Sequence, residues 1–183
     1  MKRTLILAAA MTPGTAFAHG LAAHGTLGSG FAHPLAGVDH IIAMLAVGVL
    51  AAGLGGRAVW MLPLSFVVSL VLGGVLGLFI PGFHGVEPMI LASMVVLGGM
   101  VAFALRPAMS VLIGMVPVFG LAHGWAHGAE APAQGFAVYA VGFVVATAGL
   151  HLVGMVMARV LTSTVLRVLG AGSAVAGLAL ALA

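Results

Sequence analysis

Long apolar segments, each close to the length of a membrane-spanning helix, follow one another along most of this chain. We place them at about 34–54, 58–79, 88–105, 108–128, 135–158 and 164–182, and each approaches the roughly 20 residues that cross a hydrocarbon core. Turn-forming stretches such as GLGGR and GAEAPAQ separate them. Only 5% of the 183 residues are charged, whereas a soluble domain carries about 25%. The sequence therefore predicts an all-α integral membrane protein, a bundle of six transmembrane helices.

The first residues have the pattern of a secretory signal peptide. Lys2 and Arg3 precede the apolar run TLILAAAMT, and the small residues AFA end at Ala18. Because the run is short for a membrane span, we expect cleavage after Ala18, which leaves one membrane domain over residues 19–183. An uncleaved membrane anchor is the alternative.

The positions of the charged residues predict the orientation of the bundle. If the cleaved N-terminus lies outside, every arginine of the membrane domain falls at a cytoplasmic helix end or loop, as the positive-inside rule requires: Arg57, Arg106, Arg159 and Arg167. An even number of spans then places the C-terminus outside as well. We expect a multi-pass protein of the bacterial inner (cytoplasmic) membrane with both ends outside.

Composition excludes several classes of site. The six basic residues are scattered and form no nucleic-acid patch. The absence of cysteine excludes disulfides, iron–sulfur clusters and thiolate metal sites. Eight histidines outnumber the three acidic residues, so metal binding through imidazole nitrogens remains open.

Glycines recur at four-residue spacing inside two of the apolar segments. Gly73 and Gly77 form one set, and Gly120, Gly124 and Gly128 form the other. Small residues at this spacing let helix backbones approach closely in membranes, so the spacing predicts tight helix packing.

The motif HPLAGVDH, residues 33–40, places ionisable side chains where the first apolar segment begins. Pro34 suits the first turn of a helix, so we expect His33 at or just before the helix start. In one continuous helix, His33, Gly37, His40 and Met44 share a stripe, with the two histidines about 10 Å apart along the axis. This spacing favours a path into the membrane over one compact ligand set.

Asp39 lies beside this stripe and is costly to bury. A carboxylate at the centre of a membrane helix costs about 2.5–3.5 kcal/mol on insertion scales, and less near the interface. A cation, a water-filled cavity or a hydrogen-bond partner must compensate for it. The structural alternative is that Asp39 caps a neighbouring helix or orients His40 by accepting its ring N–H.

A second motif, HGWAHGAE, lies at the outer end of the fourth segment. His123, His127 and Glu130 fall on one helical face, where two imidazoles and a carboxylate can bind one divalent ion. The motif is not that of a zinc protease, because Gly124 stands where HExxH requires its glutamate. Two interfacial histidines beside an interfacial Trp125 are the structural alternative.

Three further residues are weaker candidate ligands. His151 is either an inner relay ligand or a histidine satisfied by a backbone carbonyl. His19 could chelate through its own imidazole and a terminal amine if cleavage exposes it, and Met44 lies one turn beyond His40. His84 and Glu87 are expected in a solvated outer loop.

The two motifs HPLAGVDHIIAMLAVG (33–48) and HGWAHGAE (123–130), with six spans after a signal peptide, resemble the HupE/UreJ proteins across essentially the whole chain. The resemblance implies a nickel or cobalt permease associated with hydrogenase or urease maturation. Its motif positions in this sequence are His33, Asp39, His40, His123, His127 and Glu130.

We therefore expect uptake of a divalent cation, Ni²⁺ first and Co²⁺ second, by a permease that is not an enzyme and holds no permanently bound cofactor. Its partners are the ion, the lipid bilayer and, as candidates, cytoplasmic metallochaperones of hydrogenase or urease assembly. Two alternatives stay open. One is a membrane haem protein with two axial histidines, and the other is an intramembrane metalloenzyme using Glu130 or Asp39 as its base.

Overall fold

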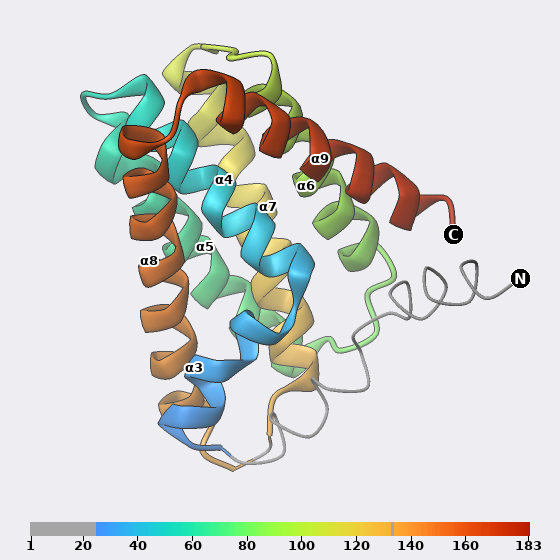
Figure 1. Cartoon of the computed structure of the whole chain (residues 1–183). Coiled ribbons are helices and arrows are strands. Elements are labelled where there is room, and N and C mark those ends of the chain that lie inside the picture. Colours follow the sequence, from blue (N-terminus) through green and yellow to red (C-terminus); the bar gives the residue numbers. More distant parts are fainter. Residues whose placement is uncertain (1–24, 133) are drawn as a thin grey trace, which may run out of the picture.

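The computed structural model describes residues 25–132 and 134–183, which form a bundle of α-helices labelled α3 to α9 (Figure 1). The expected signal peptide and His19 lie outside the described residues. The helix bounds are α3 Leu27–Ala36, α4 Val38–Leu54, α5 Ala58–Phe79, α6 Val86–Ala102, α7 Met109–Glu130, α8 Phe136–Val160 and α9 Ser163–Ala181.

Four of these helices, α5, α7, α8 and α9, are long and apolar enough to cross a membrane. The pair α3 and α4 passes the same test together but is bent by 87° at Gly37, and α6 is apolar with 17 residues. The chain is thus a helical, multi-pass membrane protein, and no strand occurs within the described ranges. The six-span topology stays a prediction.

The first apolar segment differs from the single helix expected over 34–54. Helix α3 begins earlier, because Thr26 accepts a hydrogen bond from the backbone N–H of Ser29 and the Ser29 hydroxyl accepts one from the backbone N–H of Thr26. Pro34 lies inside α3, and the chain then passes through an extended Gly37 into α4. Glycine is a poor helix former, and Asp39 stabilises the new N-terminus of α4. The single stripe predicted for His33, Gly37, His40 and Met44 is therefore wrong.

Helices α5 and α7 pack closely through the two predicted sets of glycines. A Cβ atom at Gly124 would collide with the carbonyl oxygen of Leu70, and one at Gly73 would collide with that of Leu121. Gly128 meets the backbone of Gly74 in the same way. The tight packing predicted from the glycine spacing is confirmed for this pair, and it fixes the position of the α7 histidines.

Helix α8 packs against both α3 and α4, while α6 and α9 form a pair at one side (Figure 1). The buried core between α4, α5, α7 and α8 includes Met44, Leu62, Phe66, Leu112 and Tyr139. Large apolar side chains also cover the outside, for example Val71 and Leu72 on α5. Such an apolar exterior fits a lipid environment.

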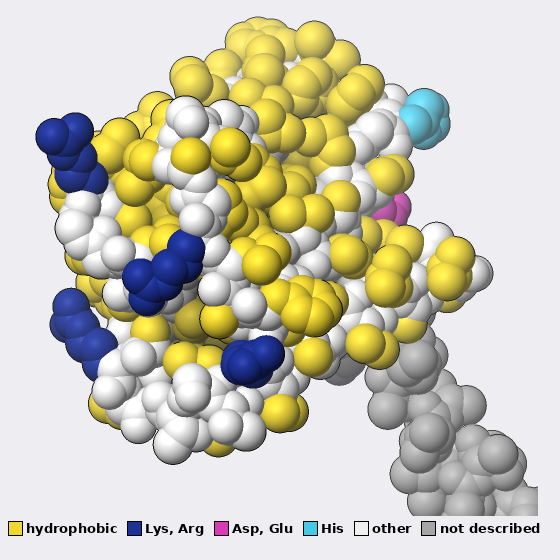
Figure 2. Space-filling model, turned by 90° about the horizontal axis from the view of Figure 1, so that it is seen from above, with side chains coloured by type: hydrophobic (Ala, Val, Ile, Leu, Met, Phe, Trp, Pro, Cys, Tyr) yellow, Lys and Arg dark blue, Asp and Glu magenta, His cyan; other side chains and the backbone are white. Residues whose placement is uncertain are grey.

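Charged side chains separate to the two ends of the bundle. Figure 2 looks onto the end that carries the connections after α4, α6 and α8, where basic side chains gather over an otherwise apolar surface. The basic residues of the described chain are Arg57, Arg106, Arg159 and Arg167. The acidic residues, Asp39, Glu87 and Glu130, lie at the opposite helix ends, in the first turns of α4 and α6 and the last turn of α7.

Candidate metal site

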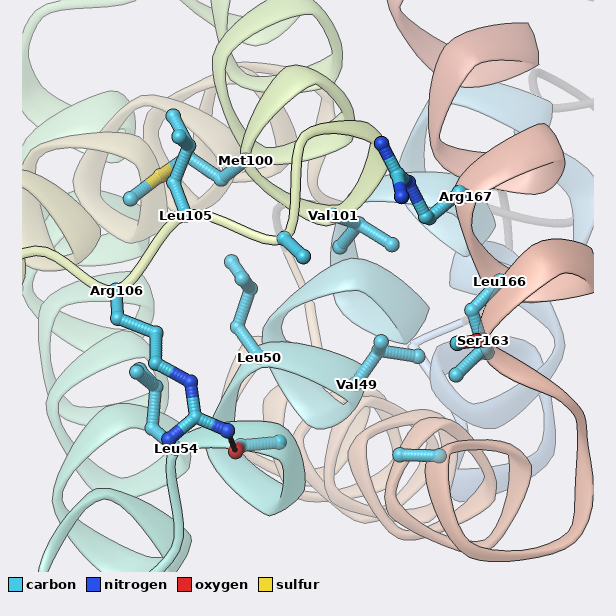
Figure 3. A pocket seen from close by; sticks show the side chains of 13 residues that line it. Val49, Leu50, Leu54, Met100, Val101, Leu105, Arg106, Ser163, Leu166 and Arg167 are labelled. Carbon is cyan, nitrogen blue, oxygen red and sulfur yellow. Dashed lines mark hydrogen bonds between the residues drawn. The ribbon is translucent and has the colours of Figure 1, made fainter.

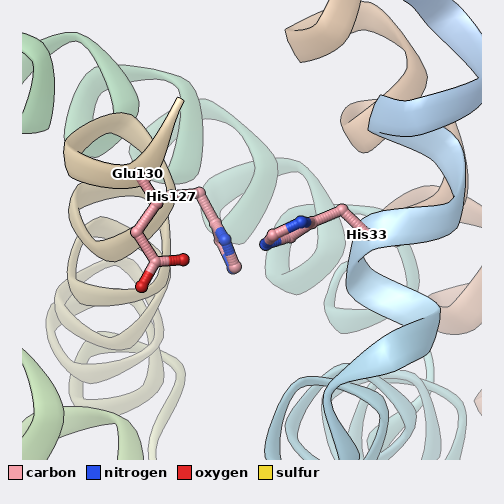
Figure 4. Close-up of side chains that lie close together, drawn as sticks. All are labelled: His33, His127 and Glu130. Carbon is pink, nitrogen blue, oxygen red and sulfur yellow. The ribbon is translucent and has the colours of Figure 1, made fainter. Parts of the chain in front are cut away.

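His33, His127 and Glu130 meet at the acidic end of the bundle (Figure 4). Each offers one ligand atom, and these atoms lie within 4.8 Å of one another. His33 reaches in from α3, while His127 and Glu130 come from the last turns of α7. The two histidines are buried and Glu130 is exposed, so the group opens to the outside of the bundle at the carboxylate.

Two further histidines continue the cluster inward. The ring centroid of His40 lies 4.4 Å from that of His127 and 5.1 Å from that of His123. His123 precedes His127 by one turn of α7 and is fully buried. The imidazoles of α3, α4 and α7 thus form one continuous set, which we call the histidine cluster: His33, His40, His123 and His127.

The bend at Gly37 is what makes this cluster compact. In a straight helix His33 and His40 would lie about 10 Å apart along the axis. Instead, the two rings both contact His127, with centroid distances of 4.6 Å and 4.4 Å. The expectation that the two histidines favour a path over a compact set is corrected accordingly.

Asp39 orients the ring of His40. Its Oδ1 lies 2.7 Å from Nδ1 of His40 and accepts a second hydrogen bond, of 3.0 Å, from the backbone N–H of the same residue. An ionised carboxylate can only accept, so Nδ1 carries a proton; in the neutral imidazole Nε2 then has the lone pair. The structure thus contains the orienting contact that the sequence left as an alternative, and it leaves Nε2 available to a metal.

His123 is oriented in the same way by its own helix. Its Nδ1 donates to the carbonyl oxygen of Phe119 at 2.8 Å, because a carbonyl oxygen can only accept. Among the described residues, the buried Nε2 atoms of His40 and His123 and both ring nitrogens of His127 have no hydrogen-bond partner. Buried polar atoms without a partner are rare in folded proteins. In a neutral imidazole one ring nitrogen has a lone pair, so each of these three histidines can offer one nitrogen to a cation.

The donor set fits a borderline divalent ion. Imidazole nitrogens with a carboxylate suit Ni²⁺, Co²⁺, Cu²⁺ and Zn²⁺. Two ligands at about 2.1 Å on opposite sides of an ion are about 4.2 Å apart. Because the atoms of His33, His127 and Glu130 lie within 4.8 Å of one another, small side-chain rotations would bring them to bonding distance.

Aromatic side chains that the sequence analysis did not single out surround the cluster. Phe143 of α8 lies 4.3 Å from the His127 ring, and Tyr139, one turn earlier, lies 5.7 Å from the His33 ring. Phe66 of α5 lies 5.5 Å from His123. The four-residue spacing of Tyr139 and Phe143 on one helix face is the signal that could have found them. Their rings exclude water and strengthen electrostatic interactions inside the site.

The other candidate residues lie apart from the histidine cluster. Trp125 turns away from it and donates from Nε1 to the carbonyl oxygen of Ile80 at 2.7 Å, so this tryptophan is not on the face of the α7 histidines. His84 lies in the exposed turn before α6, and Glu87 is exposed in the first turn of that helix. Met44 and His151 are fully buried deeper in the bundle.

A pocket at the arginine end is separate from this site (Figure 3). It lies between α4, α6, α8 and α9, and its lining is largely apolar. Arg106 and Arg167 line it and donate to backbone carbonyl oxygens, those of Gly53 at 3.2 Å and Ala102 at 2.8 Å. Its described lining residues include no histidine or carboxylate, so it offers no cation ligands of the kind found in the histidine cluster.

The comparisons with known proteins agree with the resemblance seen in the motifs. The family model described as "HupE / UreJ protein" matches residues 7–180. A similar curated protein is "Protein HupE" of Rhizobium leguminosarum bv. viciae, which is 42% identical over 188 residues covering 98% of this chain and 96% of that protein. No solved structure matches the chain significantly. Because the family match covers nearly the whole chain and the identity to this relative is high, the chain belongs to the HupE/UreJ family.

Proposed function

We propose that this protein is a permease that takes up a divalent transition-metal cation, with Ni²⁺ as the first candidate and Co²⁺ as the second. Membership in the HupE/UreJ family supports a transporter of such metals. We further propose that the chain crosses the bacterial inner membrane six times, with both ends outside and the arginine end in the cytoplasm. The imported ion would supply hydrogenase or urease maturation, with cytoplasmic metallochaperones as partners.

The observation that carries this proposal is the fixed orientation of the imidazoles. His40 and His123 each donate Nδ1–H to an oxygen of the protein, the Asp39 carboxylate and the Phe119 carbonyl. Metal-ligating histidines nearly always make such a second hydrogen bond, which sets the tautomer and raises the basicity of the other nitrogen. The buried Nε2 atoms without a partner are then ligands held in position for an ion.

The cation would enter at the exposed carboxylate. Glu130, His127 and His33 replace part of its water shell, and His40 and His123 receive it one turn deeper. Asp39 would not bind the ion directly. Its carboxylate lies on the far side of the His40 imidazole, from where its negative charge partly neutralises the positive charge of the ion. Such ligands must bind firmly enough to admit the ion and loosely enough to release it.

The membrane potential is sufficient to drive uptake. The sequence contains no nucleotide-binding P-loop. A divalent ion moving inward through 100 mV gains about 4.6 kcal/mol, twice the roughly 2.3 kcal/mol of a single charge. Uptake therefore needs no ATP-hydrolysing domain in this chain.

The packing of the cluster disfavours the two alternatives. A haem with two axial histidines needs a gap for the porphyrin between them, whereas His127 packs against His33, His40 and Phe143 with centroid distances of 4.3–4.6 Å. A metalloenzyme needs a free general base beside its metal. Asp39 already accepts two hydrogen bonds from His40, which makes it a positioning group for this histidine. Glu130 lies among the candidate ligand atoms, and a carboxylate bound to the ion is not a free base.

The test is uptake of radiolabelled nickel by cells that produce the protein. His40→Ala should abolish accumulation while the protein still inserts into the membrane, and His84→Ala is the matched control because that histidine is exposed and outside the cluster. Competition by unlabelled Co²⁺ and Zn²⁺ in the same assay ranks the ions. Normal nickel uptake by the His40→Ala variant would show that the proposed route is wrong.

A further inference from the structure

His151 lies deep in the bundle and takes no part in the histidine cluster. It is 1% exposed, and neither of its ring nitrogens has a hydrogen-bond partner among the described residues. The backbone-carbonyl contact that the sequence left open for this histidine is therefore not made. A buried polar group without a partner costs about 1–3 kcal/mol, so the position is a costly one unless a ligand uses it.

Thr147 lies one turn before His151 on the same face of α8 and shares this property. Its side chain is fully buried, and its hydroxyl has no partner within the described ranges. Buried hydroxyls in helices usually donate to a carbonyl of the preceding turn. Ser69 and Ser93 do so here, to Phe66 at 2.9 Å and Ile90 at 2.6 Å. Thr147 is thus an exception among the buried hydroxyls of the described residues.

The position of His151 lies on the inward continuation of the histidine cluster. A Cβ atom at Gly48 of α4 would collide with the carbonyl oxygen of His151, so the two residues are at one level. Gly48 follows His40 by about two turns, or about 12 Å, toward the arginine end. Met44 lies between them on the same face of α4 and is fully buried.

One aromatic ring contacts a histidine of each set of polar side chains. The Phe66 ring of α5 lies 5.5 Å from the His123 ring and meets the His151 ring edge-on at 5.2 Å. Phe66 is itself fully buried. An ion that passes from His123 to His151 must therefore displace or pass this ring.

Resting on the proposed permease function, we propose that His151 and Thr147 form an inner station for the transported divalent cation, with Phe66 as the barrier between it and the histidine cluster. One imidazole nitrogen and one hydroxyl oxygen are few protein ligands, so water completes the shell of the ion. All three carboxylates of the chain lie at the other end. The inner station consequently binds more weakly than the histidine cluster, as release toward the arginine end requires.

The test separates binding from transport in the purified full-length protein. Nickel binding is measured at equilibrium in detergent, and nickel flux is measured in proteoliposomes with an inside-negative potential. Thr147→Val keeps the shape of the side chain and removes the unpartnered hydroxyl, and His151→Gln keeps a polar group of similar reach. His84→Gln is the control for the loss of an exposed imidazole.

Both variants should keep nickel affinity at the histidine cluster within about twofold, while flux falls by about 10-fold or more for His151→Gln and several-fold for Thr147→Val. Thr147→Val should leave the thermal unfolding midpoint unchanged or raised, because it removes a buried unpaired hydroxyl. A purely structural hydroxyl would leave flux unchanged.

Wild-type flux in both variants, with flux abolished by His40→Ala, would overturn the inner station and leave the permease proposal standing. Loss of equilibrium binding in His151→Gln would also overturn it, because the two sites would not be separate. If the wild-type protein neither binds nor moves nickel, the proposed function itself fails.

Discussion

The carboxylate of Asp39 and the imidazole of His40 form one unit at the bend between α3 and α4, with 2.7 Å between Oδ1 and Nδ1. The same oxygen accepts the backbone N–H of His40 at 3.0 Å. Ring orientation, tautomer and helix start are therefore set by a single side chain. The least exposed acidic residue of the described chain is thus the one that sets the tautomer of a histidine in the cluster.

Replacing Asp39 by Asn tests this unit. Asparagine can still accept a hydrogen bond but lacks the negative charge that offsets the charge of a cation bound at His40 Nε2, so nickel affinity should fall by about 10–100-fold. Glu87→Gln is the matched control, because Glu87 also occupies the first turn of a helix but is exposed and outside the cluster. Equal nickel affinities of the Asp39→Asn and Glu87→Gln proteins would contradict the orienting role.

Gly37 leaves room for the same pair. A Cβ atom there would lie 2.7 Å from Nδ1 of His40 and 2.8 Å from Oδ1 of Asp39. Cβ atoms in real structures essentially never come this close to another heavy atom. Gly37→Ala should therefore displace the pair and weaken nickel binding by about 10-fold, measured by equilibrium binding. Gly28→Ala in α3 meets nothing within 4 Å and should bind nickel as the wild type does; a loss in both would point to the helix and not to the pair.

The packing of α5 against α7 should be sensitive to a single methyl group. A Cβ atom at Gly124 would collide with the backbone of Leu70, and overpacking of this kind costs about 1–3 kcal/mol. Gly124→Ala should lower the thermal unfolding midpoint of the detergent-purified protein. Gly114→Ala on the same helix meets nothing within 4 Å and should leave the midpoint unchanged or raise it, since alanine favours helix more than glycine does.

Protons should compete with the metal at the mouth. A protonated imidazole cannot bind an ion, so initial uptake rates should fall as the external pH is lowered from about 7.5 to about 5.5. The membrane potential is clamped with an ionophore during the measurement, so that only the ligands respond to pH. A flat profile over this interval would contradict competition by protons, and the His84→Ala protein should keep the wild-type profile.

The sequence predicted the helical membrane class and the residues that come together, for clear physical reasons. An apolar chain with 5% charge has few ways to fold outside a bilayer. Burying an ionisable residue in such a chain costs enough free energy to indicate a functional site, here in the segments around His33 and His127. Glycine spacing likewise predicted that the helices now seen as α5 and α7 pack tightly, because small residues let helix backbones approach. That these two helices pack against each other is known only from the structure.

The bend at Gly37 could not be predicted, because a glycine and a proline inside a long apolar segment are also compatible with one continuous membrane helix. Pro34 was placed in a first turn, whereas the Thr26–Ser29 capping pair begins the helix earlier. The spacing of apolar residues along the chain does not reveal that the axes of two successive helices, α3 and α4, differ in direction by 87°. The aromatic rings around the cluster and the second hydrogen bond of each histidine depend on tertiary contacts, which one sequence does not contain.

The separation of charge described for the two ends gives the molecule a permanent electrical polarity along its helices. In the orientation proposed above, a cation outside would be drawn to the end with Asp39, Glu87 and Glu130, whereas one on the other side would meet the field of the arginines first. For a permease inserted in this orientation, the seven charged side chains of the described residues would therefore favour entry of a cation from outside and oppose its return from the cytoplasm.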